Sequence, residues 1–225
     1  MESPKGSKLQ MQKISADENR NVLESLLGQE LEILCPINFK EYQLNNKEML
    51  DKLGLVPSSF NGFWPNRQPQ WDGIALGKKD NTLFLIEAKA HLSEIGSGNT
   101  PPKSTDSSQK KANFETIRTT LLKEKDHYSS EVDEKVWLHR FYQIANRLAF
   151  LRKTIELSNN TTKYNQVKLV FLNFTNDPYW LAKNLNATEN DWRNKYHDIW
   201  IKMGISEAKL RDNILILCVD AQKLK

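Results

Sequence analysis

Residues 71–90, WDGIALGKKDNTLFLIEAKA, contain two apolar segments separated by a short polar turn. The pattern predicts a strand over residues 71–76, a turn at GKKDN and a more apolar strand over residues 82–90. Side chains alternate along a strand, so Leu85, Glu87 and Lys89 share one face, whereas Ile86 and Ala88 share the other. The second strand is therefore expected to be buried on both faces and to end in a carboxylate and an amine.

The segments on either side of this hairpin alternate between helical and strand patterns. Helices are predicted over residues 15–27, 47–53, 112–125, 135–157 and 178–203, and strands over residues 167–174 and 214–219; residues 31–35 fit either a strand or a helix tail. This order predicts the α/β class, with a central mixed β-sheet flanked by helices. We expect residues 1–14 to be flexible and residues 15–225 to form one domain with a flexible loop at 93–109.

The turn also predicts the register of the hairpin. A turn centred on residues 79 and 80 sets Ile74 opposite Leu85 and Asp72 opposite Glu87, with Cβ atoms about 5 Å apart. Two facing carboxylates repel one another, and a bound divalent cation removes that repulsion. Carboxylate and carbonyl oxygens suit Mg²⁺, so Asp72, Glu87 and the backbone carbonyl of Ala88 are the expected metal ligands.

Lys89 lies two residues beyond Glu87 on the same face, where it can orient an attacking water or neutralise a developing negative charge. A second interpretation stays open from the residues alone. Lys89 can form a structural ion pair with Glu87 or Asp72 and require no metal.

Asp72 followed by Glu87-Ala88-Lys89 on a hairpin, after an N-terminal helix, resembles the PD-(D/E)XK nuclease superfamily. The resemblance covers residues 15 to 220 and implies a restriction-endonuclease-like core. It also implies cleavage of DNA with Mg²⁺ or Mn²⁺, in a restriction, defence or repair setting, by a protein that can act as a homodimer. One departure is that Trp71, not proline, precedes Asp72.

Members of this superfamily often contribute further residues from two helices. An acid from the first helix is expected to be Glu18, with Glu24 as the alternative; Glu18 can instead complete a capping box with Ser15. A polar residue on the helix after the E-x-K strand is expected to be Gln143. Arg147 and Arg140 lie beside it in the sequence and can meet phosphate.

Composition narrows the remaining function classes. The net charge of +4 agrees with a polyanionic partner, and two cysteines far apart indicate buried thiols. No P-loop, GxGxxG or HExxH motif is present. No apolar signal core or bilayer-length run occurs either, so we expect a cytoplasmic protein.

The sequence thus predicts a Mg²⁺-dependent DNA endonuclease. Two alternatives remain: a non-catalytic nucleic-acid- or protein-binding module on the same fold, and an unrelated α/β enzyme for a small anionic substrate.

Overall fold

The computed structural model describes residues 5–38, 40–96, 103, 105–129 and 131–225. Its strands are β1 (Leu31–Cys35), β2 (Gly73–Gly77), β3 (Thr82–Lys89), β4 (Gln166–Thr175) and β5 (Ile214–Asp220). Its helices are α1 (Ser7–Ser15), α2 (Arg20–Leu27), α3 (Lys47–Leu53), α4 (Ser108–Tyr128), α5 (Tyr142–Leu157), α6 (Pro178–Leu181), α7 (Glu189–Met203) and α8 (Glu207–Leu210). Short 3₁₀ segments cover Pro57–Phe60, Leu92–Glu94, Ser158–Asn160 and Ala221–Lys223, and a π-helical turn covers Val136–Arg140.

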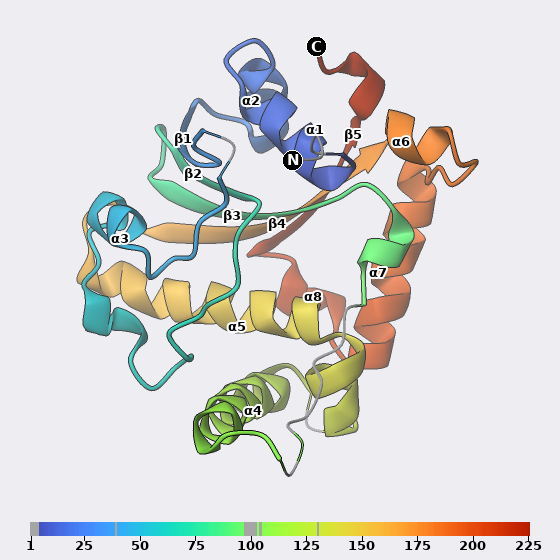
Figure 1. The fold of residues 1–225 in the computed structure, drawn as a ribbon. Helices are drawn as coiled ribbons and strands as arrows, with labels where there is room; N and C mark the ends of the chain where they lie inside the picture. Colours follow the sequence, from blue (N-terminus) through green and yellow to red (C-terminus); the bar gives the residue numbers. More distant parts are fainter. Residues whose placement is uncertain (1–4, 39, 97–102, 104, 130) are drawn as a thin grey trace.

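The strands form one mixed sheet in the order β1-β2-β3-β4-β5 (Figure 1). The pairs β1–β2 and β2–β3 are antiparallel, whereas β3–β4 and β4–β5 are parallel. The α/β class with helices around a mixed sheet is therefore confirmed. The ambiguous segment 31–35 is a strand.

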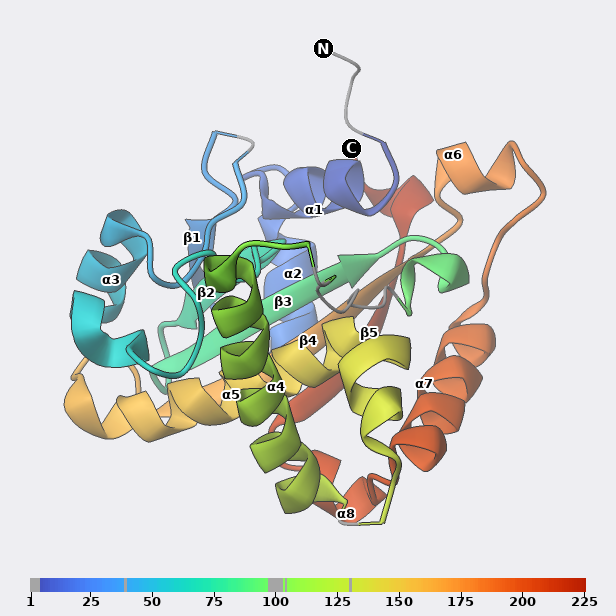
Figure 2. The same cartoon turned by 60° about the horizontal axis from the view of Figure 1, so that its bottom comes forward.

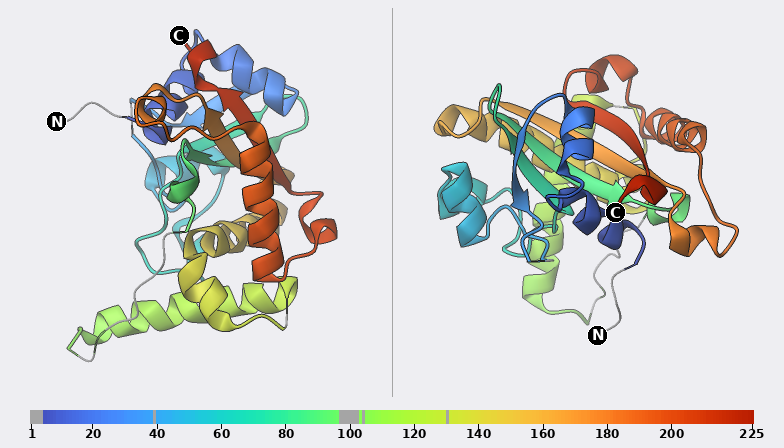
Figure 3. Two further views of the ribbon diagram at one scale, coloured as in Figure 1. Left: turned by 90° about the vertical axis from the view of Figure 1, so that its right-hand side faces the viewer. Right: turned by 90° about the horizontal axis from the view of Figure 1, so that it is seen from above.

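Helices cover both faces of the sheet (Figures 1 and 3). Helices α1 and α2 pack on one face, through the buried side chains of Met11, Ile14 and Leu23. Helix α5 lies across the other face, and Figure 2 shows α4 crossing over α5. Gly73 allows α1 to approach, because a Cβ there would lie 2.5 Å from the Met11 Cε.

The N-terminal part differs from the expected single helix over residues 15–27. Helix α1 occupies Ser7–Ser15, inside the segment expected to be flexible, and α2 starts only at Arg20. Asn19, between the helices, donates to the Lys13 carbonyl and accepts from the backbone N–H of Lys225. The bond with Lys225 gives the break a tertiary cause that no local pattern contains.

Two other predicted helices are also divided, whereas the one predicted over residues 112–125 lies within the continuous α4. The segment predicted over residues 135–157 forms the π-helical turn Val136–Arg140 and then α5. The segment predicted over residues 178–203 forms α6 and α7, because Thr188 and Asp191 form a capping box that starts a new helix. The predicted loop at 93–109 contains a 3₁₀ turn and the start of α4; residues 97–102 and 104 lie outside the described part. No described helix is long and apolar enough to cross a membrane.

Candidate functional site

The β2–β3 hairpin has the predicted register, with Ile74 facing Leu85. Asp72 lies directly before β2, and its Oδ2 atom accepts a hydrogen bond of 2.7 Å from the backbone N–H of Ala88. The carboxylate of Asp72 therefore lies against the segment Glu87–Lys89 at the end of β3. Gly73 pairs with Ile86, so the same register extended by one residue sets Asp72 opposite Glu87.

Glu87 is buried and surrounded by donors. Its Oε1 atom accepts from Lys89 Nζ and, at 2.6 Å, from Gln143 Nε2; its Oε2 atom accepts from Arg147 Nε at 2.6 Å. Burial alone would raise the pKa of Glu87, but the cations of Arg147 and Lys89 outweigh it and lower that pKa. Glu87 therefore stays ionised in the fold.

Asp72 has the opposite balance. Burial and the charge of Glu87 raise its pKa from 3.8 to about 7, against the weaker opposing effects of Lys89, the Ala88 N–H and Arg147. A small part of the residue reaches solvent, but protein surrounds the carboxyl group. The group of two acids and two cations thus has one acid whose charge is poorly compensated.

Arg147 connects helix α5 to both parts of the hairpin. Its guanidinium donates to Glu87, donates to the Gln70 carbonyl at 2.7 Å and lies 4.3 Å from the centre of the Trp71 ring. Arg147 is only 4% exposed, so the expectation that it meets phosphate is not supported by its position. Arg140 is exposed and lies over the Phe141 ring.

The structure brings Gln143 to Glu87, as predicted, but it does not bring an acid from the first helices. Glu18 is exposed in the turn between α1 and α2, and it lines neither the crevice at Asp72 nor the cavity at Glu87. Glu24 accepts from the backbone N–H of Leu31, which pairs with Gly77 at the opposite end of the hairpin. The structure therefore does not bring Glu18 or Glu24 to Asp72 and Glu87. The break before α2 leaves Glu18 exposed in the turn.

The crevice beside Asp72 contains an acid that the sequence did not indicate. Glu41 lines it and forms an ion pair of 3.1 Å with Lys8 of α1. Gln12, also on α1, lines the same crevice, so the residue that the first helix contributes there is an amide and not the expected acid. Only the fold brings these segments together, and no local motif marks Glu41.

The oxygen atoms of Asp72, Glu87 and the Ala88 carbonyl are of the chemical type that a hard divalent cation prefers as ligands. The N–H and C=O of a strand residue point toward the same neighbour, so the Ala88 carbonyl lies on the edge occupied by Asp72. Among the described residues, however, no group of three or more His, Cys, Asp or Glu side chains could hold a metal. A cation bound by Asp72 and Glu87 would share Glu87 with Lys89 and Arg147.

A small cavity lies between the end of β3 and helix α5, beside Glu87. It has a volume of about 10 Å³, roughly the space of one water, and Lys89, Gln143 and Arg147 line it. Ile95, Ile144 and Phe171 also line it, so the internal space at the end of β3 has apolar as well as polar walls.

An aromatic and cationic cluster follows β3 and β4. His91 stacks on Trp180 with a centroid distance of 4.4 Å, and Lys183 lies 4.0 Å from the centre of the Tyr179 ring. The other five tryptophans are at most 6% exposed, so Trp180 is the one tryptophan ring near the surface, with all six in the described residues. Trp192 and Trp200 are core residues.

The chain was also compared with known proteins, and neither the protein-family models, nor the curated proteins, nor the solved structures gave a match.

Proposed function

We propose that the protein is a metal-dependent nuclease that hydrolyses phosphodiester bonds, acting as a DNA endonuclease in restriction, defence or repair. One observation carries the proposal. The Asp72 carboxylate, bonded to the Ala88 N–H, lies beside Glu87 at the end of β3, with Lys89 two residues farther along. The resemblance to the PD-(D/E)XK pattern rests on the same residues.

Each residue has a role that follows from its position. Asp72, Glu87 and the Ala88 carbonyl would hold Mg²⁺ or Mn²⁺, which lowers the pKa of bound water and stabilises charge on phosphorus. Lys89 would orient the attacking water or neutralise the transition state. Gln143 and Arg147 are positioning residues, because both act through Glu87.

The aromatic and cationic cluster supports a nucleic-acid substrate. His91 follows Lys89 by two residues, about 7 Å along an extended chain. Trp180 stacks on His91, and Lys183 lies 5.2 Å from the centre of the Trp180 ring. Aromatic rings stack on unpaired bases and lysines attract phosphates. The cluster would therefore hold a strand next to the scissile bond.

The test is cleavage of supercoiled plasmid, single-stranded DNA and RNA with Mg²⁺ or Mn²⁺. Glu87→Gln and Lys89→Met should each reduce cleavage about a hundredfold or more. Matched controls lie at the other end of the hairpin, where Glu30→Gln and Lys78→Met change an exposed ion pair. Full activity in Glu87→Gln would remove that residue from the mechanism, and absence of metal-dependent cleavage on all substrates would reject the proposal.

A binding module on the same fold is the second candidate, and one observation favours it. Both oxygens of Glu87 already accept from Lys89, Gln143 and Arg147, which satisfies the carboxylate without a metal. Thermal unfolding with added Mg²⁺ or Mn²⁺ separates the candidates. A metal site raises the Tm of the natural protein but not that of Glu87→Gln, whereas a binding module shows no such difference.

A further inference from the structure

Strand β5 is the outer strand of the sheet on the side opposite β1. The Asn213 carbonyl accepts a 2.8 Å hydrogen bond from the Leu169 N–H, so the backbone groups of Asn213 face β4. By alternation along the strand, the backbone groups of Ile214, Ile216 and Cys218 point away from the sheet. These donors and acceptors are arranged to pair with one more strand.

Up to Asp220 at its end, the edge lacks the proline and charged residues that often prevent strand addition. Residues 214–219, ILILCV, contain no proline and no charged side chain. The segment is apolar and mostly half-buried rather than covered. The backbone of β5 is thus a template for pairing.

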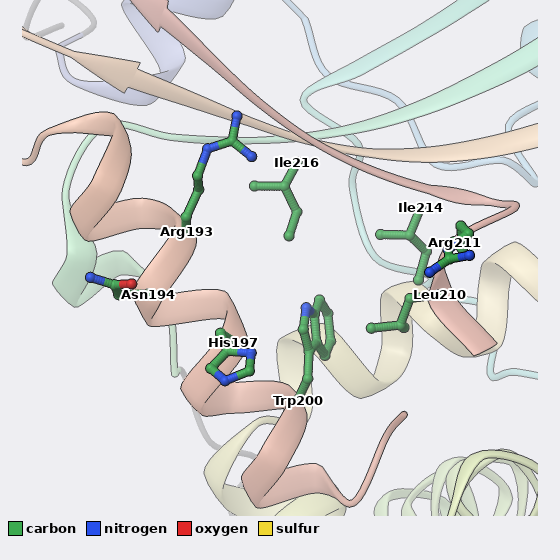
Figure 4. Close-up of a pocket in the computed structure, with 8 residues that line it drawn as sticks. All are labelled: Arg193, Asn194, His197, Trp200, Leu210, Arg211, Ile214 and Ile216. Atoms are coloured by element: carbon green, nitrogen blue, oxygen red, sulfur yellow. The ribbon is translucent and has the colours of Figure 1, made fainter. Parts of the chain in front are cut away.

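A cavity of about 460 Å³ lies along this edge, between β5 and helix α7 (Figure 4). Ile214 and Ile216 project into it from β5, and Trp200 projects from α7. These side chains give the cavity an apolar floor. An added strand could place alternate apolar side chains against it.

The rim of the cavity is basic. Arg193 of α7 lies at one end and Arg211, just before β5, at the other; no acidic side chain is among the lining residues. Arg211 is exposed and forms no ion pair with the acids that the structure describes, while Arg193 pairs with Glu189 at the surface. The positive charge of Arg211 therefore favours an acidic occupant at that end of the groove, and Arg193 can exchange its surface pairing with Glu189 for one at the other end.

We propose that β5 and the groove beside it bind an extended acidic peptide segment of a partner protein as an added strand. A second copy of the chain is a poorer occupant. Antiparallel pairing of two β5 strands would leave both α7 helices on the same face of the joined sheet and set two basic grooves side by side. The proposal does not depend on nuclease activity.

The test uses a synthetic peptide in which valine alternates with threonine between acidic ends, titrated calorimetrically into the whole protein. A peptide with lysine in place of the acids is the matched control. Methylating the alternate backbone nitrogens that face β5 should abolish binding, whereas methylating the other set should leave it within about twofold. Equal effects of the two methylated sets would overturn strand addition.

Charge reversal provides the second arm. The double variant Arg193→Glu/Arg211→Glu should bind the acidic peptide at least about tenfold more weakly and should now bind the lysine peptide. Far-UV circular dichroism confirms that the variant is folded. Unchanged preference for the acidic peptide would overturn the charge assignment, and concentration-dependent dimers that protect Cys218 from alkylation would identify a second copy as the occupant instead.

Discussion

Replacing Asp72 by asparagine should stabilise the metal-free protein at neutral and alkaline pH. The pKa of Asp72 is raised from 3.8 to about 7 in the fold by burial and by Glu87. A difference of about three pKa units makes the ionised form about 4 kcal/mol less favourable in the folded protein than in the unfolded chain, as an upper limit. Asparagine carries no charge, and its side-chain oxygen can still accept from the Ala88 N–H.

The sign of the pH dependence follows from proton binding. Between about pH 4 and pH 7 the folded protein binds more protons at Asp72 than the unfolded chain, so this residue makes stability fall as pH rises. Above pH 7 the destabilisation is complete. The stability gain of Asp72→Asn should therefore be near zero at about pH 4 and largest at about pH 8.

Urea unfolding of both proteins in EDTA measures this difference directly. Other titrating groups are common to the two proteins and cancel in the comparison. A variant that is less stable than the natural protein at pH 8, or a difference that does not change with pH, would refute the reasoning. Repeating the titration with Mg²⁺ should then stabilise only the protein that retains Asp72, by about 2.7 kcal/mol at a hundredfold excess over Kd.

Three further predictions concern other buried or half-buried groups. Arg147→Met should lower the free energy of unfolding in urea by about 3–5 kcal/mol, because Glu87 is left buried without its main cation. The double variant Arg147→Met/Glu87→Met should recover most of that loss. A loss below about 1 kcal/mol in the single variant would contradict this prediction. Glu124→Gln should raise the Tm at pH 8 more than at pH 5. Burial raises the pKa of Glu124 to about 7, and Arg152 opposes this only in part. Equal Tm shifts at both pH values would speak against this prediction. Trp180→Ala should weaken binding of single-stranded DNA in EDTA about tenfold, whereas Trp180→Phe should retain the affinity. Fluorescence anisotropy measures both affinities. Unchanged affinity in the alanine variant would exclude base stacking on Trp180.

The hairpin could be predicted because its information is local. Apolar alternation and a short polar turn fix which residues face one another, and the pairing of Ile74 with Leu85 follows from them. Gln143 was expected at the site from the resemblance to the superfamily, as a polar residue on a helix after the E-x-K strand. Its partner is Glu87.

The N-terminal region could not be predicted in the same way. Helix α1 has a weak apolar pattern, and the Nε2 of its buried Gln10 donates to Asp177, which is 167 residues away in the sequence. Asn19, at the break, accepts from the backbone N–H of Lys225, which is 206 residues away in the sequence. Glu18 was assigned to the site by a helical geometry that these distant contacts interrupt.

The contact of Arg147 with Trp71 has a consequence for how the site can vary. The Trp71 ring packs against the Arg147 guanidinium, and this guanidinium neutralises Glu87. Arg147 also donates to the Gln70 carbonyl, so the segment before β2 is held directly to helix α5. A smaller side chain at position 71 would release the arginine and, through it, alter the charge at the end of β3. We therefore expect natural relatives to vary at positions 71 and 147 together. Relatives with an arginine at 147 should have an aromatic ring at 71, and relatives without the arginine should lack the ring.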